Sequence, residues 1–270
     1  MKNKKLSHNG LQGSVTSVMA ALLCILIGLF VGFLVLLAIN PAHAWADGFV
    51  RILKGGFHDA PYGVGKELAN AAPLIMTGLS VGFAFKTGLF NIGAAGQYTL
   101  GAYGALYCAI MLKLPWFVCL LAAAILGGLW GAIPGFFKAY FNINEVITSI
   151  MFNWIGLYLV NELIYQNGTG PMYDVRNTRT LNLSKNADFA QSLIPDFGLN
   201  KLFQTNSTTI AIFLAAAVAI LIWVVLNKTT FGYELKAVGL NKSAARYAGI
   251  NEKKNIILSM AIAGALAGFG

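Results

Sequence analysis

FGYELKAVGLNKSAARYAGINEKK, residues 231–254, is a long charged segment between two apolar stretches of the chain. Glu234 and Glu252 are outnumbered there by five cations: Lys236, Lys242, Arg246, Lys253 and Lys254. Charged side chains are costly in lipid, so we expect the segment to lie outside a bilayer that its apolar neighbours cross. Because an excess of lysine and arginine is typical of cytoplasmic loops, the segment predicts a cytoplasmic location for itself and helical spans on either side.

One short helix is predicted inside this segment. Asn241 can accept a backbone N–H as its N-cap, and Gly249 can adopt the left-handed conformation that ends a helix. Lys242 and Arg246 fall on one face, and the opposite, apolar face is formed by Leu240, Ala244, Tyr247 and Ala248. A small apolar face beside two cations predicts a docking surface; an ordinary basic loop is the alternative interpretation.

The composition is that of a polytopic membrane protein. Of the 270 residues, 57% are hydrophobic and 11% are charged, against about 25% charged residues in soluble domains, and the mean hydropathy is +0.67. The net charge of +9 is carried by cations at the ends of apolar runs, as membrane topology predicts, and not by the stripes expected of a nucleic-acid-binding protein. Three cysteines lie in apolar runs without paired spacing, so neither a disulfide framework nor a metal site is predicted.

Val18–Ile39 is the first predicted span. It follows a polar start at 1–17 and runs without a charge for about 20 residues, the length that a bilayer requires. Small residues at 42, 44 and 46 leave a cleaved signal peptide as the alternative, but the apolar region of such peptides is about 7–15 residues long. We therefore predict an uncleaved first helix with a cytoplasmic N-terminus, in which Gly28 and Gly32 form a strip for close helix contact.

The apolar region Ala71–Leu112 follows an outside segment, 40–70, in which Trp45–Leu53 is predicted to form a short interfacial helix. The region is interrupted by KTGLFNIGAAGQYTLGAYG, where Asn91 and Gln97 stand among five glycines. Glycines weaken a helix by about 1 kcal/mol each relative to alanine, and non-helical backbone at membrane depth must border protein or a water-filled cavity. A broken or re-entrant segment beside a substrate site is therefore predicted; a tight helical hairpin packed through glycine is the alternative.

Two further spans are predicted at 115–137 and from Glu145 to Ile164, joined by a cytoplasmic turn at 139–144. In the first, glycines recur every four residues and predict a packing face: Gly127, Gly131 and Gly135. In the second, polar side chains share one helix face: Glu145, Thr148, Ser149 and Asn153.

Polar groups inside a span are expected to face the bundle interior or a pathway. The predicted substrate pathway therefore consists of Asn91, Gln97, Glu145, Thr148 and Asn153. Asn153, two turns deeper than Glu145, is the better candidate of that helix, because Glu145 is near the helix end and can instead reach the interface.

The remaining segments complete an all-α helical bundle. Residues 166–207 form a polar loop predicted to be extracytoplasmic, 208–226 span back, and 227–255 form the cytoplasmic loop. The cytoplasmic loop has six lysines and arginines and the longer outside loop has four, which places the N-terminus inside. The apolar run that ends at Gly270 is too short to span. We predict one transmembrane domain, 1–270, C-terminally incomplete, with about six complete spans and a truncated seventh.

Three motifs resemble the permease subunits of ABC importers, in the branch for simple sugars and nucleosides that is similar to the ribose and branched-chain amino-acid permeases. SAARYAG at 243–249 resembles the coupling loop, GLSVGFAFKTGLFNIGAAGQYTLGAYGA at 78–105 the signature segment, and NEVITSIMFNW at 144–154 a further stretch. Ser243 replaces the usual glutamate, and Ala95 stands where an acidic residue is common. The resemblance implies that the ATPase is coupled through Lys242, Ala244, Ala245, Arg246, Tyr247 and Gly249.

The resemblance also implies the partners of the chain. ATPase subunits hydrolyse ATP, a second permease (a homologue or a copy) completes the pathway, and an extracytoplasmic substrate-binding lipoprotein docks on the outside loops. The chain is then a multi-pass protein of the bacterial cell membrane and a translocation subunit, not an enzyme. In agreement, the sequence contains no P-loop, no catalytic or metal-ligating constellation, and no cofactor motif.

Nucleosides are the expected solutes, and ribose or galactose come next. The predicted pathway side chains are mostly uncharged, which suits a neutral hydroxylated solute. A branched-chain amino acid is a further alternative, although a zwitterion is expected to find ionic partners within the spans. An ion-coupled secondary transporter is the alternative from another class, but it needs ionisable groups inside the membrane, and only Glu145 comes near one.

Overall fold

The computed structural model describes residues 3–57 and 59–270, with side chains described from residue 18 onward except at 58, 167 and 185. The chain divides into two compact units, 1–64 and 65–270. Helices dominate both, and the strands of the described residues form one short hairpin.

The first unit is built on one long helix, α1 (Asn3–Ile39), which contains the predicted span Val18–Ile39. The segment after it is helical, as predicted, and comprises η1 (Ala44–Phe49), α2 (Val50–Lys54) and η2 (Gly55–Phe57). The rings of Trp45 and Phe49 pack on Phe33 of α1, with centroids 5.7 and 5.0 Å away. No atom lies within 4 Å of a Cβ added at Gly28 or Gly32, so their role in helix contact stays a prediction.

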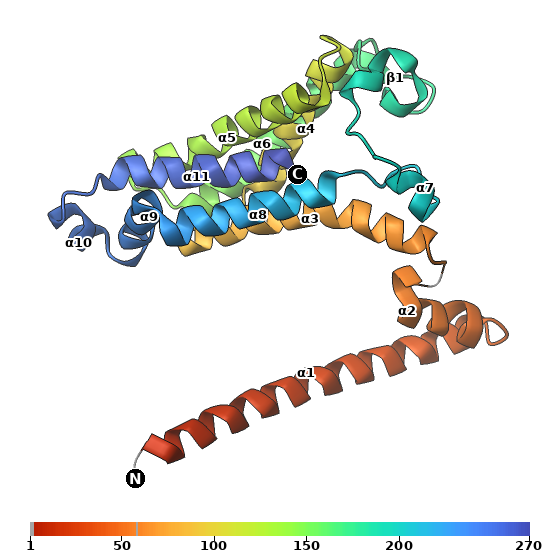
Figure 1. The fold of residues 1–270 in the computed structure, drawn as a ribbon, viewed down its shortest axis with the longest axis horizontal. Helices are drawn as coiled ribbons and strands as arrows, with labels where there is room; N and C mark the ends of the chain where they lie inside the picture. The colour runs from red at the N-terminus through yellow and green to blue at the C-terminus, as the bar shows by residue number, and fades with distance from the viewer. Residues whose placement is uncertain (1–2, 58) are drawn as a thin grey trace. The chain divides into compact units, whose positions relative to one another are not determined.

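The second unit is a bundle of six longer helices, of which α3 has its first three residues in the first unit. They are α3 (Tyr62–Lys86), α4 (Ala94–Ile110), α5 (Trp116–Phe141), α6 (Glu145–Tyr165), α8 (Ala211–Lys228) and α11 (Glu252–Phe269) (Figure 1). Two boundaries differ from the prediction by more than three residues. α3 extends over the polar residues before Ala71, and α5 continues through Phe141 until Asn142 adopts the left-handed conformation (φ 51°).

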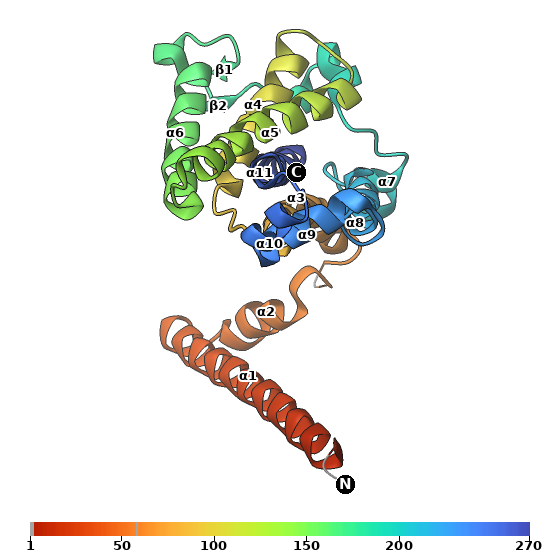
Figure 2. The ribbon, with the colours of Figure 1, turned by 90° about the vertical axis from the view of Figure 1, so that its left-hand side faces the viewer.

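α11 occupies the centre of this bundle, seen end-on in Figure 2 between α5 and the pair α3 and α8. It packs on α5 through glycines, because a Cβ at Gly127 comes within 2.5 Å of the Gly264 oxygen, and one at Gly268 within 2.9 Å of the Gly127 Cα. The predicted glycine packing face of α5 is thereby confirmed, and its partner is identified. Met260 and Ala263 of α11 are fully buried.

Five of the described helices are long and apolar enough to cross a membrane: Val18–Ile39 of α1, α3, α5, α6 and α8. α4 has 17 residues and α11 has 18, beginning with the charged residues of 252–254. The chain is thus an all-α polytopic membrane protein, and the count of six spans with part of a seventh stays a prediction.

The loop after α6 folds into short elements. They are η3 (Gln166–Gly168), the antiparallel strands β1 (Tyr173–Asp174) and β2 (Arg179–Thr180), η4 (Leu183–Lys185), η5 (Ala187–Ser192) and α7 (Leu199–Phe203). A small core of Ile110, Met172 and Phe189 holds the loop on α4. Ser192 Oγ adds a hydrogen bond of 2.6 Å to the Leu114 carbonyl, so the loop is anchored at the α4–α5 connection.

The charged segment 231–254 contains two helices where one was predicted. α9 (Thr230–Leu240) precedes α10 (Lys242–Tyr247), and Asn241 separates them. Thr229 caps α9, because its hydroxyl accepts the Gly232 N–H at 3.1 Å. Leu235 and Val238 bury one face of α9, which explains why this stretch is helical despite its charges.

Candidate functional site

α10 has the ends that the sequence predicted. Asn241 Oδ1 accepts the Ala244 N–H at 3.0 Å, so Asn241 is the N-cap. Gly249 has φ +81° and its N–H reaches the Arg246 carbonyl at 3.0 Å, so it ends the helix in the left-handed conformation. Ala245, 4% exposed, is the buried side chain of the helix and joins α10 to the core of the second unit.

The apolar face predicted as a docking surface is open to solvent. Leu240 is 89% exposed and Tyr247 is 94% exposed, and Ala244 and Ala248 beside them are also exposed. We call these four residues the α10 face. Exposed apolar side chains that gather on one helix face, unlike those scattered singly, are typical of interaction sites.

The cations of α10 differ in their surroundings. Lys242 is exposed at the start of the helix. Arg246 forms an ion pair with Glu252, the first residue of α11, which links the end of α10 to the central helix. Ser243 is exposed like its neighbour Ala244.

α9 connects the α10 face to the non-helical segment that follows α3. Gly88 (φ +74°) lies against Gly239 so closely that a Cβ added to it would stand 2.4 Å from the Gly239 Cα. On the other side, Asn255 Nδ2 of α11 donates to Glu234 Oε2 of α9 at 3.3 Å. Backbone contact and hydrogen bonding therefore join α9 to the segment after α3 and to α11.

The segment between α3 and α4, residues 87–93, places polar side chains in the interior. Asn91 and Gln97, each 1% exposed, exchange two amide hydrogen bonds of 2.8 and 3.0 Å. Asn91 Nδ2 also donates to Ser80 Oγ at 3.2 Å, and Ser80 donates to the Ala263 carbonyl of α11 at 2.6 Å. A second bond to α11 joins Thr87 and Ser259.

Asn153 of α6 faces the same segment. Its Oδ1 accepts the Gly96 N–H at 2.8 Å and its Nδ2 donates to the Ile92 carbonyl at 2.9 Å, so it caps the first turn of α4. Ser149, one turn earlier, is fully buried and its hydroxyl has no partner among the described residues. α6 thus places two polar side chains against the start of α4.

The other two candidates of α6 lie at its first turn and are bonded locally. Thr148 Oγ1 donates to the Asn144 carbonyl at 2.9 Å, and Glu145 pairs with Lys138 of α5 at 2.8 Å. Asn91, Gln97 and Asn153 therefore gather at the start of α4, whereas Glu145 and Thr148 form the α5–α6 turn. Sequence reasoning missed Ser80, Thr87 and Ser259, whose signal is a small hydroxyl inside an apolar run.

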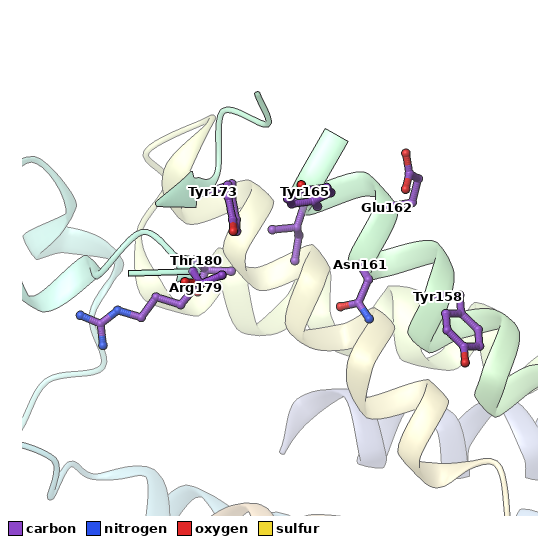
Figure 3. A pocket seen from close by; sticks show the side chains of 9 residues that line it. Tyr158, Asn161, Glu162, Tyr165, Tyr173, Arg179 and Thr180 are labelled. Atoms are coloured by element: carbon purple, nitrogen blue, oxygen red, sulfur yellow. The ribbon is translucent and has the colours of Figure 1, made fainter. Parts of the chain in front are cut away.

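A cavity of about 670 Å³ lies at the opposite end of α6, beside the β-hairpin. Figure 3 shows its side chains, which come from the last turns of α6 and from the strands: Tyr158, Asn161, Glu162, Tyr165, Tyr173 and Arg179. Aromatic rings combined with an amide, a carboxylate and a guanidinium can stack on a planar solute and hydrogen-bond to its edges. At the hairpin, a hydrogen bond from Asn177 lowers the pKa of Asp174. None of these cavity residues was predicted from the sequence.

The sequence profile of the family described as the branched-chain amino acid transport system permease component matches residues 65–270. The chain is 35% identical to the guanosine ABC transporter permease protein NupP of Bacillus subtilis, over 98% of this chain and 71% of that protein. It is 33% identical to the nucleoside ABC transporter permease protein NupB of Lactococcus lactis, over 94% and 69%, respectively. A glucose ABC transporter permease protein of Haloferax volcanii is also 33% identical, over 92% and 65%.

No solved structure matches the chain significantly. The profile match covers the whole of the second unit, including the glycine-rich segment, the polar face of α6 and α10. The chain therefore belongs to the family of branched-chain amino acid transport system permease components, and it is an ABC importer permease of the type that includes nucleoside and simple-sugar permeases.

Proposed function

We propose that the chain is the membrane-spanning subunit of an ATP-driven importer of nucleosides. Two relatives with 33–35% identity over nearly the whole chain are named for guanosine and nucleoside transport, and this is the observation that carries the proposal. Simple sugars are the second candidate, because a relative of 33% identity is named for glucose. The uncharged interior side chains Asn91, Gln97 and Asn153 are compatible with either neutral solute.

The α10 face is the proposed docking site for the ATPase subunits. Leu240 and Tyr247 offer exposed apolar surface, Lys242 and Arg246 offer charge, and Ala245 holds the helix on the core. Because Gly249 ends α10 in a conformation that other residues adopt with strain, the orientation of this face depends on it. In this proposal Ala244, Ala245 and Gly249 shape the helix, and Tyr247 makes the principal contact.

Movement of α10 reaches the substrate pathway through the contacts of α9. The close approach of Gly88 and Gly239 couples α9 to the segment that carries Asn91, and Glu234 couples it to α11. ATP binding and hydrolysis by the partner subunits would shift α9 and α10 together and so alter the packing around Asn91 and Gln97. In the present conformation these two amides bond to each other, so admission of a solute requires their separation.

The proposed topology places the N-terminus and the loop 227–255 in the cytoplasm and the loop 166–207 outside. A substrate-binding lipoprotein docks on the outer loop, and the cavity beside Tyr158, Tyr165 and Arg179 receives the solute from it. A second permease subunit, a copy or a homologue, completes the pathway. Asn153 lines that pathway, and the Glu145–Thr148 end of α6 lies at its cytoplasmic gate.

The test is uptake into proteoliposomes that contain the permease assembled with its ATPases and the binding lipoprotein. We expect ATP-dependent uptake of guanosine and other nucleosides, and little uptake of ribose, galactose or glucose. Gly249→Val, whose β-branched side chain can adopt the left-handed conformation only with strain, should abolish uptake without preventing assembly. Uptake of a sugar but not of nucleosides would change the proposed solute and leave the proposed mechanism unchanged.

The source of energy distinguishes an ABC importer from an ion-coupled secondary transporter. Uptake that persists without ATP and stops when the proton gradient is collapsed would contradict the ABC mechanism. Uptake that stops without ATP and survives a protonophore supports it.

Gly249→Asn, which tolerates the left-handed conformation, should retain most of the activity and serves as the matched control for the inactivating variant at Gly249.

A further inference from the structure

A furrow between α3 and α8 combines apolar walls with cations at one end. Figures 1 and 2 both show the two helices side by side, and the furrow holds a cavity of about 440 Å³. Its residues include Leu79, Phe83 and Ile222 on the walls, and Lys86, Asn227 and Lys236 at the end. An apolar channel that terminates at positive charge matches the chemistry of an amphipathic anion.

Within the described part of the chain, the cations at the end of the furrow have no carboxylate partner. No carboxylate of the described residues is within ion-pair distance of Lys86 or Lys236. Lys236 Nζ donates to Asn227 Oδ1 at 3.2 Å, and this neutral amide leaves its charge uncompensated. Lys228, next in the chain, stands over the ring of Trp223, 5.9 Å from the centroid.

The furrow runs along two helices that can span a membrane. Its walls belong to α3 and α8, both long and apolar enough to span a membrane. Lys86 lies in the last turn of α3 and Lys228 in the last turn of α8, so the cations lie where both helices leave the hydrocarbon. Trp223, which also lines the cavity, has the amphipathic ring typical of the headgroup region.

The apolar wall is open enough to accept a chain. A Cβ added at Gly82 meets no atom within 4 Å, and Trp223 is 57% exposed. Basic pockets between spans at the cytoplasmic side commonly bind the headgroups of anionic lipids. A free phosphate would use the cations but leave the apolar walls without a partner.

We propose that this furrow binds one anionic phospholipid. An acyl chain lies between α3 and α8, and the phosphate is held by the ammonium groups of Lys86 and Lys236. The site joins α3 to α9, so a bound lipid bridges a span and the cytoplasmic helix that precedes α10. Selectivity comes from net charge, because a zwitterionic lipid offers the same chains but a compensated headgroup.

The experiment is native mass spectrometry of the full chain with phosphatidylglycerol or phosphatidylcholine of identical acyl chains. We expect phosphatidylglycerol to bind about tenfold more tightly, and the double variant Lys86→Gln with Lys236→Gln to remove that difference. Lys86→Arg with Lys236→Arg should retain it. Lys253→Gln, which removes a cation at the same end of the bundle outside the furrow, is the matched control and should bind as the parent does.

The apolar half is tested separately. Gly82→Leu fills the furrow without a change in charge and should lose phosphatidylglycerol; Ala219→Leu is the second variant if Gly82→Leu does not fold. Any of three results would overturn the proposal. Both lipids could bind equally well, glycerol 3-phosphate could compete as well as the intact lipid, or binding could be insensitive to the lysine and Gly82 variants. The proposal would also be overturned if no lipid were bound because a second permease subunit covers the furrow.

Discussion

The side-chain amides of Asn91 and Gln97 form a closed pair, in which each donates to the oxygen of the other at 2.8 and 3.0 Å. Both are almost fully buried. Each therefore satisfies polar atoms of the other that have no access to water, and the pair fixes the start of α4 relative to the segment before it.

Removal of one partner of this pair should be costly. Asn91→Leu or Gln97→Met alone leaves a buried amide without its partner, for which we expect a loss of about 1–3 kcal/mol in the free energy of unfolding. The double variant should lose less than the sum of the two. Unfolding of the purified chain in mild detergent measures all three, with Thr99→Val, a half-buried site on α4 outside the amide pair, as the control. Additive losses would contradict the pairing.

Asn153 is predicted to order α4 from a neighbouring helix. Asn153→Ala removes the acceptor of the Gly96 N–H and the donor to the Ile92 carbonyl, at a cost of about 1 kcal/mol, as for a lost N-cap. Hydrogen exchange of the amides at 94–98 should become faster, while that of α5 is unchanged. Trp154→Ala, on the exposed side of α6, is the control; an equal effect of both variants would refute a capping role.

The ion pair of Lys138 and Glu145 is predicted to hold the α5–α6 turn. The atoms are 2.8 Å apart and the side chains are 18% and 14% exposed, so Glu145→Gln should destabilise by about 2 kcal/mol. The pair of Lys113 and Asp188, 3.4 Å apart with side chains 55% and 61% exposed, is the internal comparison. Its Lys113→Gln variant should cost less than about 1 kcal/mol. Equal thermal shifts for the two variants would show that burial does not strengthen the first pair.

Two residues of α10 should separate coupling from folding. Tyr247→Ala removes an exposed ring, so stability should be unchanged while ATP-dependent uptake falls about tenfold, as expected for an interface anchor. Ala245→Leu overpacks a buried site and should lower stability by about 1–3 kcal/mol. Tyr233→Ala, at an exposed aromatic of α9, should leave uptake intact. Normal uptake by Tyr247→Ala would remove the α10 face from the coupling mechanism.

The glycine contact of α5 and α11 is predicted to tolerate no side chain. A Cβ at Gly131 would stand 2.5 Å from the Met260 oxygen, so Gly131→Ala should push the helices apart and cost about 1–3 kcal/mol or more. Gly82→Ala introduces the same methyl group where no atom lies within 4 Å, and it should be neutral or slightly stabilising. The melting temperatures of the Gly131→Ala and Gly82→Ala variants are compared with that of the parent chain. Equal shifts would mean that α5 and α11 separate easily.

Local patterns in the sequence predicted much of this architecture. Asn241 and Gly249 bound α10 as expected, because caps depend on one side chain and one backbone conformation. The glycine repeat of α5 predicted a packing face, which the structure confirms. α9 was missed because its charges hid a buried face formed by Leu235 and Val238.

Such local patterns could not predict contacts between residues that are distant in the chain. Polarity selected Asn91 and Gln97 but could not show that they bond to each other, because amides of a pathway and amides of a core look alike in sequence. The sequence predicts a pathway role for Asn153, and the structure gives it a capping interaction with α4. The central place of α11 was hidden too, since its apolar run is short and its partners are distant in the chain.

The position of α11 has a consequence for biosynthesis. Ser80 and its acceptor at Ala263 are 183 residues apart. The glycine surface of α5 likewise has its packing partner in α11, which is synthesised later. Because translation proceeds from the N-terminus, the helices from α3 to α8 enter the bilayer before the helix that fills their centre exists. Their small residues and hydroxyl groups must therefore remain compatible with lipid or with translocon contact during synthesis, and a ribosome that stalls before residue 252 leaves a bundle without its core.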